Sequence, residues 1–170
     1  SDGQVLLPGE VGEIMIRTEV LMKGYWNRAD ATKEAIVNGW FHTGDAGYFD
    51  EEGFLYIHDR VKDMIVSGGE NIYPAEVENA LFAHPGIADV AVIGIPDDNW
   101  GEAVQAFVVL ASEDSVQEED ILEFARGRIA SYKVPKAIKF LEILPRNPSG
   151  KILRRELRDP YWKGKKRRVN

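Results

Sequence analysis

The sequence contains no cysteine among its 170 residues, which excludes disulfide bonds and thiolate metal sites. It contains no apolar run close to the roughly 18 residues that a membrane-spanning helix requires. The first four residues, Ser-Asp-Gly-Gln, lack the basic start and apolar core of a secretory signal peptide. Together these absences favour a cytoplasmic protein. The chain also lacks an initial methionine, which is typical of a fragment or of removal of methionine before serine.

Hydrophobic residues and charges, by contrast, are plentiful. The hydrophobic fraction of 44% is sufficient for a packed core and argues against wholesale disorder. The net charge of −7 is unevenly distributed, because residues 1–130 carry 25 acidic and 8 basic side chains, whereas residues 131–170 carry 3 and 13. The C-terminal region is therefore either a solvated basic tail or a site for polyanions such as nucleotide phosphates.

The basic residues of this region divide into two groups. Those inside patterned segments are the better candidates for phosphate binding: Lys133, Lys136, Lys151, Arg154 and Arg155. Those near the C-terminus resemble a solvated tail: Lys163, Lys165, Lys166, Arg167 and Arg168. This tail lacks the interleaved aromatic residues on which single-strand binders stack bases, so we expect no nucleic-acid partner.

Turn residues and hydrophobic periodicity predict an α+β protein in two parts, with the boundary between them near residues 60–62. Residues 1–59 are β-rich, and the strands are expected at 13–17 and 40–45, with a hairpin joining 48–49 to 54–57. A short helix is expected at 31–37, with Asp30 as its N-cap.

The hydrophobic pattern of residues 64–170 predicts a small domain with a short mixed or antiparallel sheet and flanking helices. Its strands are expected at 89–96, 103–110 and 137–144. Its helices are expected at 74–84 with Pro74 in the first position, at 115–129 with Ser115 as cap and Glu118 in the capping box, and at 151–158.

The stretch 58–72 combines alternating charges, a short apolar run and a pair of glycines. Gly68 and Gly69 allow positive φ and leave no side chain in the way of a ligand. The pattern is also that of a hairpin with a glycine bulge and solvated charges. In an extended segment Arg60 and Lys62 would share one face.

Two further short motifs can carry chemistry. The loop 147–151 presents Lys151, which is either a solvated charge or a point charge able to reach phosphate oxygens. Asp45 follows Thr43 and Gly44, and its carboxylate is either part of an ordinary turn or an acceptor for the two hydroxyls of a ribose.

Four motifs occur in order along the chain: Phe-His-Thr-Gly-Asp at 41–45, Asp-Arg-Val-Lys-Asp at 59–63, Ser-Gly-Gly-Glu-Asn-Ile-Tyr-Pro at 67–74 and Pro-Ser-Gly-Lys at 148–151. This set resembles the C-terminal part of an acyl-CoA synthetase of the adenylate-forming superfamily. The third motif, with the glycine pair at 68–69 and Pro74, resembles the fatty-acid and aryl-acid CoA ligases more than the peptide-synthetase adenylation domains.

The resemblance implies an acid–thiol ligase that uses ATP to form an acyl-adenylate and then passes the acyl group, favoured to be a fatty acid, to coenzyme A. It implies that Asp45, with Thr43 beside it, and Arg60 bind the nucleotide. It implies that residues 1–59 are the last β-rich subdomain of the adenylating N-terminal domain, that residues 60–63 form a hinge and that residues 64–170 are the mobile C-terminal domain. Lys62 is then the hinge residue about which the small domain reorients. By the same carry-over Lys151 is the catalytic lysine, which bridges the substrate carboxylate and the α-phosphate.

The coenzyme A contacts implied by the resemblance are Gly68, Gly69, Glu70, Trp100, Tyr132, Lys133 and Lys136. Trp100 is equally consistent with a half-buried surface aromatic. Val134 stands where the aryl-CoA branch can carry an arginine.

The expected cofactors are ATP and Mg²⁺, with coenzyme A as a substrate. No Gly/Ser/Thr-rich phosphate loop occurs in the 170 residues and no metal site is predicted in them, so Mg²⁺ is assigned mainly to an N-terminal domain of the same protein. The partners are thus that domain, a carboxylic acid, ATP and coenzyme A, with a peripheral membrane contact left open. Two alternatives remain: an adenylation domain that loads a carrier protein, and a non-catalytic interaction module.

Overall fold

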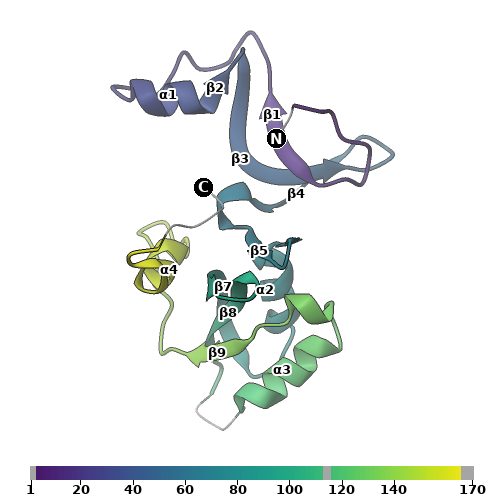
Figure 1. Cartoon of the computed structure of the whole chain (residues 1–170), viewed down its shortest axis with the longest axis vertical. Helices are drawn as coiled ribbons and strands as arrows, with labels where there is room; N and C mark the ends of the chain where they lie inside the picture. The colour runs from purple at the N-terminus through teal and green to yellow at the C-terminus, as the bar shows by residue number, and fades with distance from the viewer. Residues whose placement is uncertain (1–2, 113–115, 166–170) are drawn as a thin grey trace. The chain divides into compact units, whose positions relative to one another are not determined.

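The computed structural model describes residues 3–112 and 116–165 and divides the chain into two compact units (Figure 1). The first unit is Ser1–Val61 and the second is Lys62–Asn170. The division falls inside the segment 60–63 for which the family resemblance implies a hinge.

The first unit is built on a four-stranded antiparallel sheet with one long central strand. The strands are β1 (Gly12–Ile16), β2 (Ile36–Val37), β3 (Trp40–Phe49) and β4 (Leu55–Arg60). Strand β3 pairs with each of the other three. The hairpin predicted around residues 50–53 is confirmed, since Phe49 pairs with Leu55 across it.

The short helix of this unit, α1, spans Ala29–Ala35 and not residues 31–37. Its N-cap is Arg28, and Asp30 lies in its first turn, so the predicted cap is wrong. The β-branched pair Ile36 and Val37 leaves the helix and joins β3 through the turn at Asn38 and Gly39, both of which have positive φ.

The described residues of the second unit form a five-stranded sheet and three helices. The strands are β5 (Ile65–Ser67), β6 (Glu70–Ile72), β7 (Ile87–Asp97), β8 (Gly101–Leu110) and β9 (Ala137–Phe140). They follow the order β6-β5-β8-β7, and β9 pairs with β8 in parallel. The predicted α+β class with a mixed or antiparallel sheet is confirmed.

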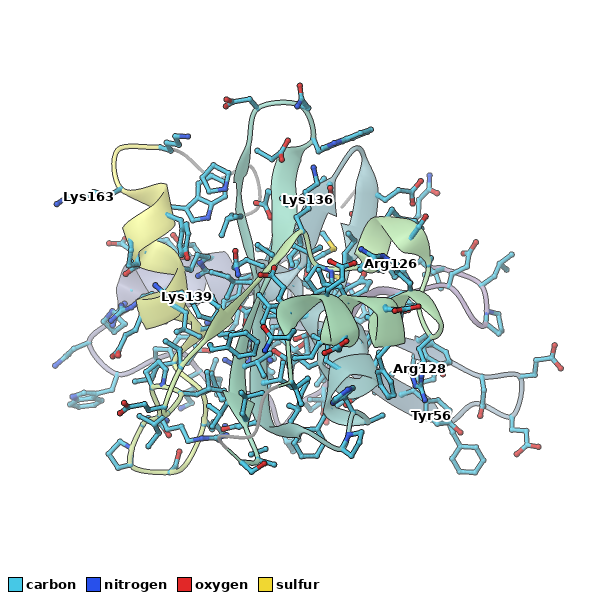
Figure 2. All side chains as sticks on the ribbon, turned by 90° about the horizontal axis from the view of Figure 1, so that it is seen from below. Tyr56, Arg126, Arg128, Lys136, Lys139 and Lys163 are labelled. Carbon is cyan, nitrogen blue, oxygen red and sulfur yellow. The ribbon has the colours of Figure 1, made fainter. Side chains whose placement is uncertain are left out.

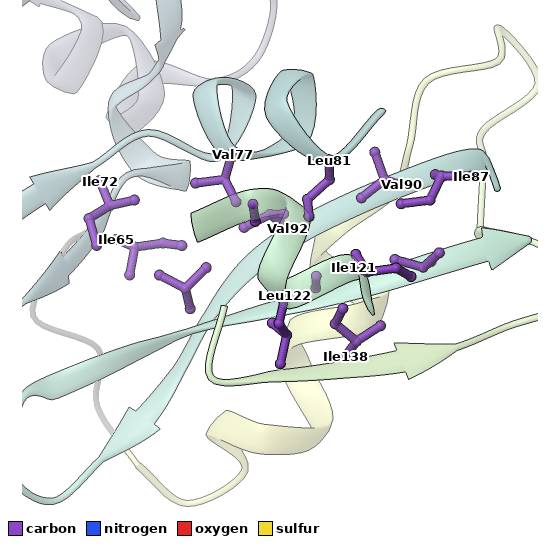
Figure 3. Close-up of a cluster of buried hydrophobic side chains, with 14 residues drawn as sticks. Ile65, Ile72, Val77, Leu81, Ile87, Val90, Val92, Ile121, Leu122 and Ile138 are labelled. Carbon is purple, nitrogen blue, oxygen red and sulfur yellow. The ribbon is translucent and has the colours of Figure 1, made fainter. Parts of the chain in front are cut away.

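The helices of this unit cover the two faces of its sheet. They are α2 (Pro74–Phe82), α3 (Glu118–Arg126) and α4 (Arg154–Trp162), with 3-10 turns η1 (Val61–Asp63) and η2 (Ser131–Lys133). Helices α2 and α3 enclose the larger apolar cluster, in which Ile65, Leu81 and Ile121 have no exposed surface (Figure 3). Helix α4 packs on the opposite face against a smaller cluster around Phe107 and Leu144 (Figure 1).

Several predicted boundaries in this unit differ from the structure, most of all those of α3, β9 and α4. Helix α3 begins at Glu118 behind the N-cap Gln117, whose side chain forms a capping box with Asp120. The predicted box at Glu118 is therefore wrong, and the predicted cap Ser115 lies outside the described residues. Strand β9 ends at Phe140 and helix α4 starts at Arg154, because residues 141–153 form turns around the loop of Lys151.

Candidate functional site

The predicted nucleotide-binding residues of the first unit lie together on β3 and β4. Asp45 and Arg60 are direct cross-strand partners, and the Arg60 Nε atom lies 3.8 Å from the Asp45 Oδ1 atom. Thr43 Oγ1 accepts a hydrogen bond of 3.1 Å from the Asp45 amide and donates one of 2.7 Å to the Ile14 carbonyl. Both charged side chains remain about half exposed, so each can meet a ligand.

Glu13, which the sequence did not single out, contacts two residues beside this nucleotide site. The Glu13 carboxylate accepts the amide N–H of Gly44 at 3.2 Å and lies 2.8 Å from the His42 Nδ1 atom. Gly44 has φ of +73°, a conformation that suits glycine, at the point between Thr43 and Asp45. Glu13 is 31 residues from Gly44 in the sequence, and no local motif relates the two.

The predicted hinge residue Lys62 lies in the 3-10 turn η1 and not in an extended strand. The expectation that Arg60 and Lys62 share one face of an extended segment is wrong, because β4 ends at Arg60. The next residue, Asp63, is buried, and its carboxylate lies 3.3 Å from the Arg158 guanidinium on α4. The C-terminal end of the turn is thereby tied to the second unit.

The loop of Lys151 is ordered by the side chain of Asn147. Its Oδ1 atom accepts hydrogen bonds from the Ser149 amide at 3.1 Å and from the Lys151 amide at 2.8 Å. The Asn147 amide in turn donates to the Lys151 carbonyl at 2.9 Å. The Lys151 side chain is exposed, and within residues 3–112 and 116–165 its ammonium group forms no hydrogen bond or ion pair.

Gly68 and Gly69 form the two-residue turn between β5 and β6. Their φ angles of +62° and +91° are those of the glycine-rich turns that join tight hairpins. The double glycine is therefore a hairpin turn, as one of the two sequence readings expected. A Cβ atom on Gly68 would lie 2.8 Å from the Trp100 ring, whereas one on Gly69 would meet nothing within 4 Å.

Trp100 and Lys136 meet at one carboxylate, that of Asp97. Asp97 Oδ1 accepts the Trp100 amide at 3.0 Å, and Oδ2 accepts a hydrogen bond of 3.2 Å from the Lys136 ammonium. The Lys136 ammonium also lies 5.8 Å from the centre of the Trp100 ring. The amides of Trp100 and Asn99 hold the pKa of Asp97 below its usual value, with a smaller contribution from Lys136. The sequence reading missed Asp97, which lies 39 residues from Lys136.

Lys133 and Tyr132 lie on η2, where Lys133 is already paired. Its ammonium donates to both oxygens of Glu76 on α2, at 2.6 and 2.7 Å. Burial lowers the pKa of Lys133, but the hydrogen bond and charge of Glu76 outweigh it and raise the pKa above its usual value. Tyr132 is half-exposed beside the same ammonium. Glu70, the remaining predicted contact, is an exposed residue of β6.

Three further basic side chains that Figure 2 labels lie on different parts of the second unit: Arg126 at the end of α3, Lys139 on β9 and Lys163 just after α4. Of the tail residues, Lys166, Arg167 and Arg168 lie outside the described residues. Among residues 3–112 and 116–165, no three His, Asp or Glu side chains are grouped so that they could hold a metal ion. No helix in the same ranges combines the length and apolar character needed to cross a membrane.

Comparison with known proteins relates this arrangement to one family. A family model described as the AMP-binding enzyme C-terminal domain matches residues 76–151, and Lys151 is the last residue matched. A fatty acid–[acyl-carrier-protein] ligase of Streptomyces coeruleorubidus, ScoC, is 51% identical over 99% of the chain. The long-chain-fatty-acid–CoA ligase FadD13 of Mycobacterium tuberculosis is 52% identical over 94%. The chain belongs to the adenylate-forming superfamily.

The chain of this adenylate-forming protein spans about a third of the length of these relatives, 33% of ScoC and 31% of FadD13. The o-succinylbenzoate CoA synthetase of Bacillus subtilis, solved with its acyl-adenylate intermediate, is similar in structure with a TM-score of 0.86 and 47% identity. That alignment covers 94% of this chain and 32% of the synthetase. The same synthetase has been solved with ATP and a magnesium ion.

Proposed function

We propose that this chain is the C-terminal part of an ATP-dependent acid–CoA ligase whose substrate is a fatty acid. In this proposal residues 1–59 are the last β-rich part of the large N-terminal domain, and residues 64–170 are the mobile C-terminal domain. The carboxylate oxygen of the acid attacks the α-phosphorus of ATP, pyrophosphate leaves, and an acyl-adenylate forms. The thiolate of coenzyme A then attacks the acyl carbonyl carbon, a thioester forms and AMP leaves. The similarity to FadD13 and to an adenylate-bound CoA synthetase supports both steps.

The observation that carries this proposal is the state of Lys151. A loop whose backbone is fixed by Asn147 presents an exposed ammonium that no described acidic group neutralises. Adenylation concentrates negative charge on the phosphate oxygens, and one positioned donor in a closed site contributes about 3–4 kcal/mol to its stabilisation. Lys151 is the donor that we assign to that charge.

The first unit contributes the nucleotide contacts. Asp45 accepts hydrogen bonds from the two ribose hydroxyls, and Arg60, 3.8 Å away on the neighbouring strand, pairs with that carboxylate and helps to hold it in place. Thr43 fixes the Asp45 backbone through its own hydroxyl. ATP brings Mg²⁺ with it, and we assign that ion mainly to the N-terminal domain that precedes this chain in full-length relatives.

The second unit contributes the coenzyme A contacts after rotation about Lys62. The glycine turn at Gly68 and Gly69 leaves room for the pantetheine arm, since Gly69 faces open space. Trp100 and Lys136 form a paired aromatic and cationic surface for the nucleotide end of coenzyme A. Lys133 takes part only by exchanging Glu76 for a phosphate, because the ion pair already occupies its ammonium.

The proposal is tested by Lys151→Ala in the full-length ligase. We expect acyl-adenylate formation to fall by roughly 10²–10³-fold, while thioester formation from supplied acyl-adenylate stays within about twofold of the unmodified enzyme. Lys139→Ala, which removes an exposed lysine from β9, is the matched control and should leave both steps unchanged. An equal loss in both half-reactions would refute the assignment of Lys151.

The alternative acceptor is the phosphopantetheine arm of a carrier protein, and the similarity to the acyl-carrier-protein ligase ScoC favours it specifically. Both acceptors present the same thiol arm, so the glycine turn serves either. Rates of acyl transfer from the adenylate to free coenzyme A and to a loaded carrier protein distinguish the two. A preference for the carrier protein by more than about tenfold would replace coenzyme A as the proposed acceptor.

A further inference from the structure

One arginine connects the loop of Lys151 to the sheet of the second unit. The Arg146 guanidinium donates through Nη1 to the Gly150 carbonyl at 2.5 Å and through Nη2 to the Asp89 carboxylate at 2.6 Å. Asp89 belongs to β7, 57 residues earlier in the sequence, and its other oxygen accepts the Val90 amide at 3.0 Å. Arg146 is thus a bridge between a fixed strand and the peptide unit that precedes Lys151.

The contacts of Arg146 complement those of Asn147. The Asn147 side chain holds the amide of Lys151 from inside the loop, and an isolated bridge between Arg146 and Ile152 closes its two ends. The Gly150 carbonyl belongs to the same peptide group as the Lys151 amide. Arg146 and Asn147 therefore hold the two polar atoms of one peptide group, and the orientation of that group sets the direction in which the Lys151 side chain leaves the backbone.

We propose that Arg146, anchored on Asp89, is a positioning residue that holds Lys151 in its direction of approach to the α-phosphate. This inference rests on the proposed role of Lys151 in adenylation. The guanidinium is suited to the task because its planar fork reaches two acceptors at once. The Arg146 and Asp89 side chains are 39% and 29% exposed, so the pair contributes little to overall stability and its main effect is on the geometry of the loop.

The expected functional effect is large relative to the structural one. Displacement of a catalytic group by about 1 Å can cost roughly 10²-fold in rate. Arg146→Ala releases the Gly150 carbonyl but leaves the Asn147 contacts, so we expect adenylation to slow by about 10–100-fold. The loss should appear in kcat for adenylation, with KM for ATP changed by less than about threefold, because no contact of Arg146 is with the nucleotide sites described above.

The experiment measures both half-reactions in the full-length ligase for Arg146→Ala, Arg146→Lys and Lys151→Ala. Arg126→Ala is the matched control, since Arg126 forms an exposed ion pair of 2.8 Å with Glu119 within helix α3 and not with the loop of Lys151. Arg146→Lys keeps a cation beside Asp89 but lacks the fork, so its adenylation rate should lie between those of the alanine variant and the unmodified enzyme. Asp89→Asn, which retains an acceptor for Arg146, should show a smaller loss and serves if Arg146→Ala does not fold.

The outcomes separate this inference from the proposed function. Slow adenylation with unaffected thioester formation in Arg146→Ala, and normal rates in Arg126→Ala, supports the positioning role. Unmodified adenylation in Arg146→Ala while Lys151→Ala is inactive overturns the inference but leaves the proposed function intact. Equal loss of both half-reactions in Arg146→Ala overturns it as well, because that pattern indicates a general structural role. Full adenylation activity in Lys151→Ala instead refutes the proposed function itself.

Discussion

Lys133 shows how the setting of a single residue changes the meaning of a motif. The sequence offers it as a cation for coenzyme A phosphates, whereas the structure gives it a carboxylate partner on α2. Only 18% of the Lys133 side chain and 31% of the Glu76 side chain remain exposed. A short, largely shielded ion pair of this kind stabilises the fold measurably, whereas fully exposed pairs contribute little.

Glu76→Gln should therefore lower the free energy of unfolding by about 1 kcal/mol at neutral pH, because the ammonium loses its charged acceptor. The pKa of Lys133 is raised in the folded state, so the stabilisation is complete below its unfolded pKa near 10.5 and is lost as the pH rises through the higher folded value. Urea unfolding of the unmodified and variant chains between pH 7 and about pH 11 measures this difference.

The difference between the two proteins should stay constant up to about pH 10 and shrink above it. A difference that instead grew with pH would contradict the cause given for the shift. Glu142→Gln is a suitable control, since Glu142 is an exposed carboxylate outside the helices and strands, and its replacement should leave the unfolding free energy unchanged at every pH.

The predicted site residues were read from motifs, but their partners were not predictable. Glu13, Asp89 and Asp97 each hold a site segment or side chain from a distance of 29 to 57 residues along the chain. A short motif shows which polar and charged side chains a site contains. The hydrogen-bond partner of each side chain lies far away in the sequence and is brought to it only by the folding of the chain. The glycine turn at Gly68 was foreseen as one of two alternatives because its chemistry is local.

Among the helices and strands, α3 likewise has one feature that the sequence predicts and one that it does not. Its apolar face, with Ile121, Leu122 and Ala125 buried, follows from the periodicity of the sequence. Its first residue did not follow, because several polar residues before it can serve as a cap. Glu118, which was expected in the capping box, instead accepts the Ile138 amide of β9 at 2.8 Å. The Glu118 side chain therefore ties the start of this helix to the sheet and takes no part in the capping box.

Asp120→Ala should destabilise the second unit by about 0.5–1 kcal/mol, because the Asp120 carboxylate accepts the Gln117 amide at 3.1 Å in the capping box. The loss is measured by chemical denaturation of the chain, with α-helical content followed by circular dichroism. Glu123→Ala, on the same helix but outside the cap, is the control and should change the unfolding free energy by less than half as much. An equal effect of both variants would show that the capping box is not what stabilises this end.

At the scale of the whole molecule, two ion pairs tie the beginning of the second unit to its end. Asp63 pairs with Arg158 across 95 residues, and Glu78 receives two hydrogen bonds of 2.6 and 2.9 Å from Arg154 Nη2. Both arginines lie on α4, the helix that follows the Lys151 loop. The residue after the proposed pivot Lys62 and the helix that follows the Lys151 loop therefore belong to one packed body, which is what the proposed rotation of this domain requires.

Arg158→Ala should destabilise this body by about 1–2 kcal/mol, because it leaves the Asp63 carboxylate, only 9% exposed, without that charged partner. Arg155→Ala is the control, since Arg155 is 81% exposed and 3.9 Å from Asp159.

The same ion pair also fixes Asp63, the residue that follows the proposed pivot Lys62, to helix α4. If this contact influences the rotation of the domain, Arg158→Ala should lower the overall turnover of the full-length ligase more than it lowers the rate of either half-reaction measured alone. Only the complete cycle includes the rotation. Denaturant unfolding and rapid-quench measurements of each step give the two quantities. Turnover reduced no more than its slower half-reaction would show that the ion pair stabilises the domain without influencing its rotation.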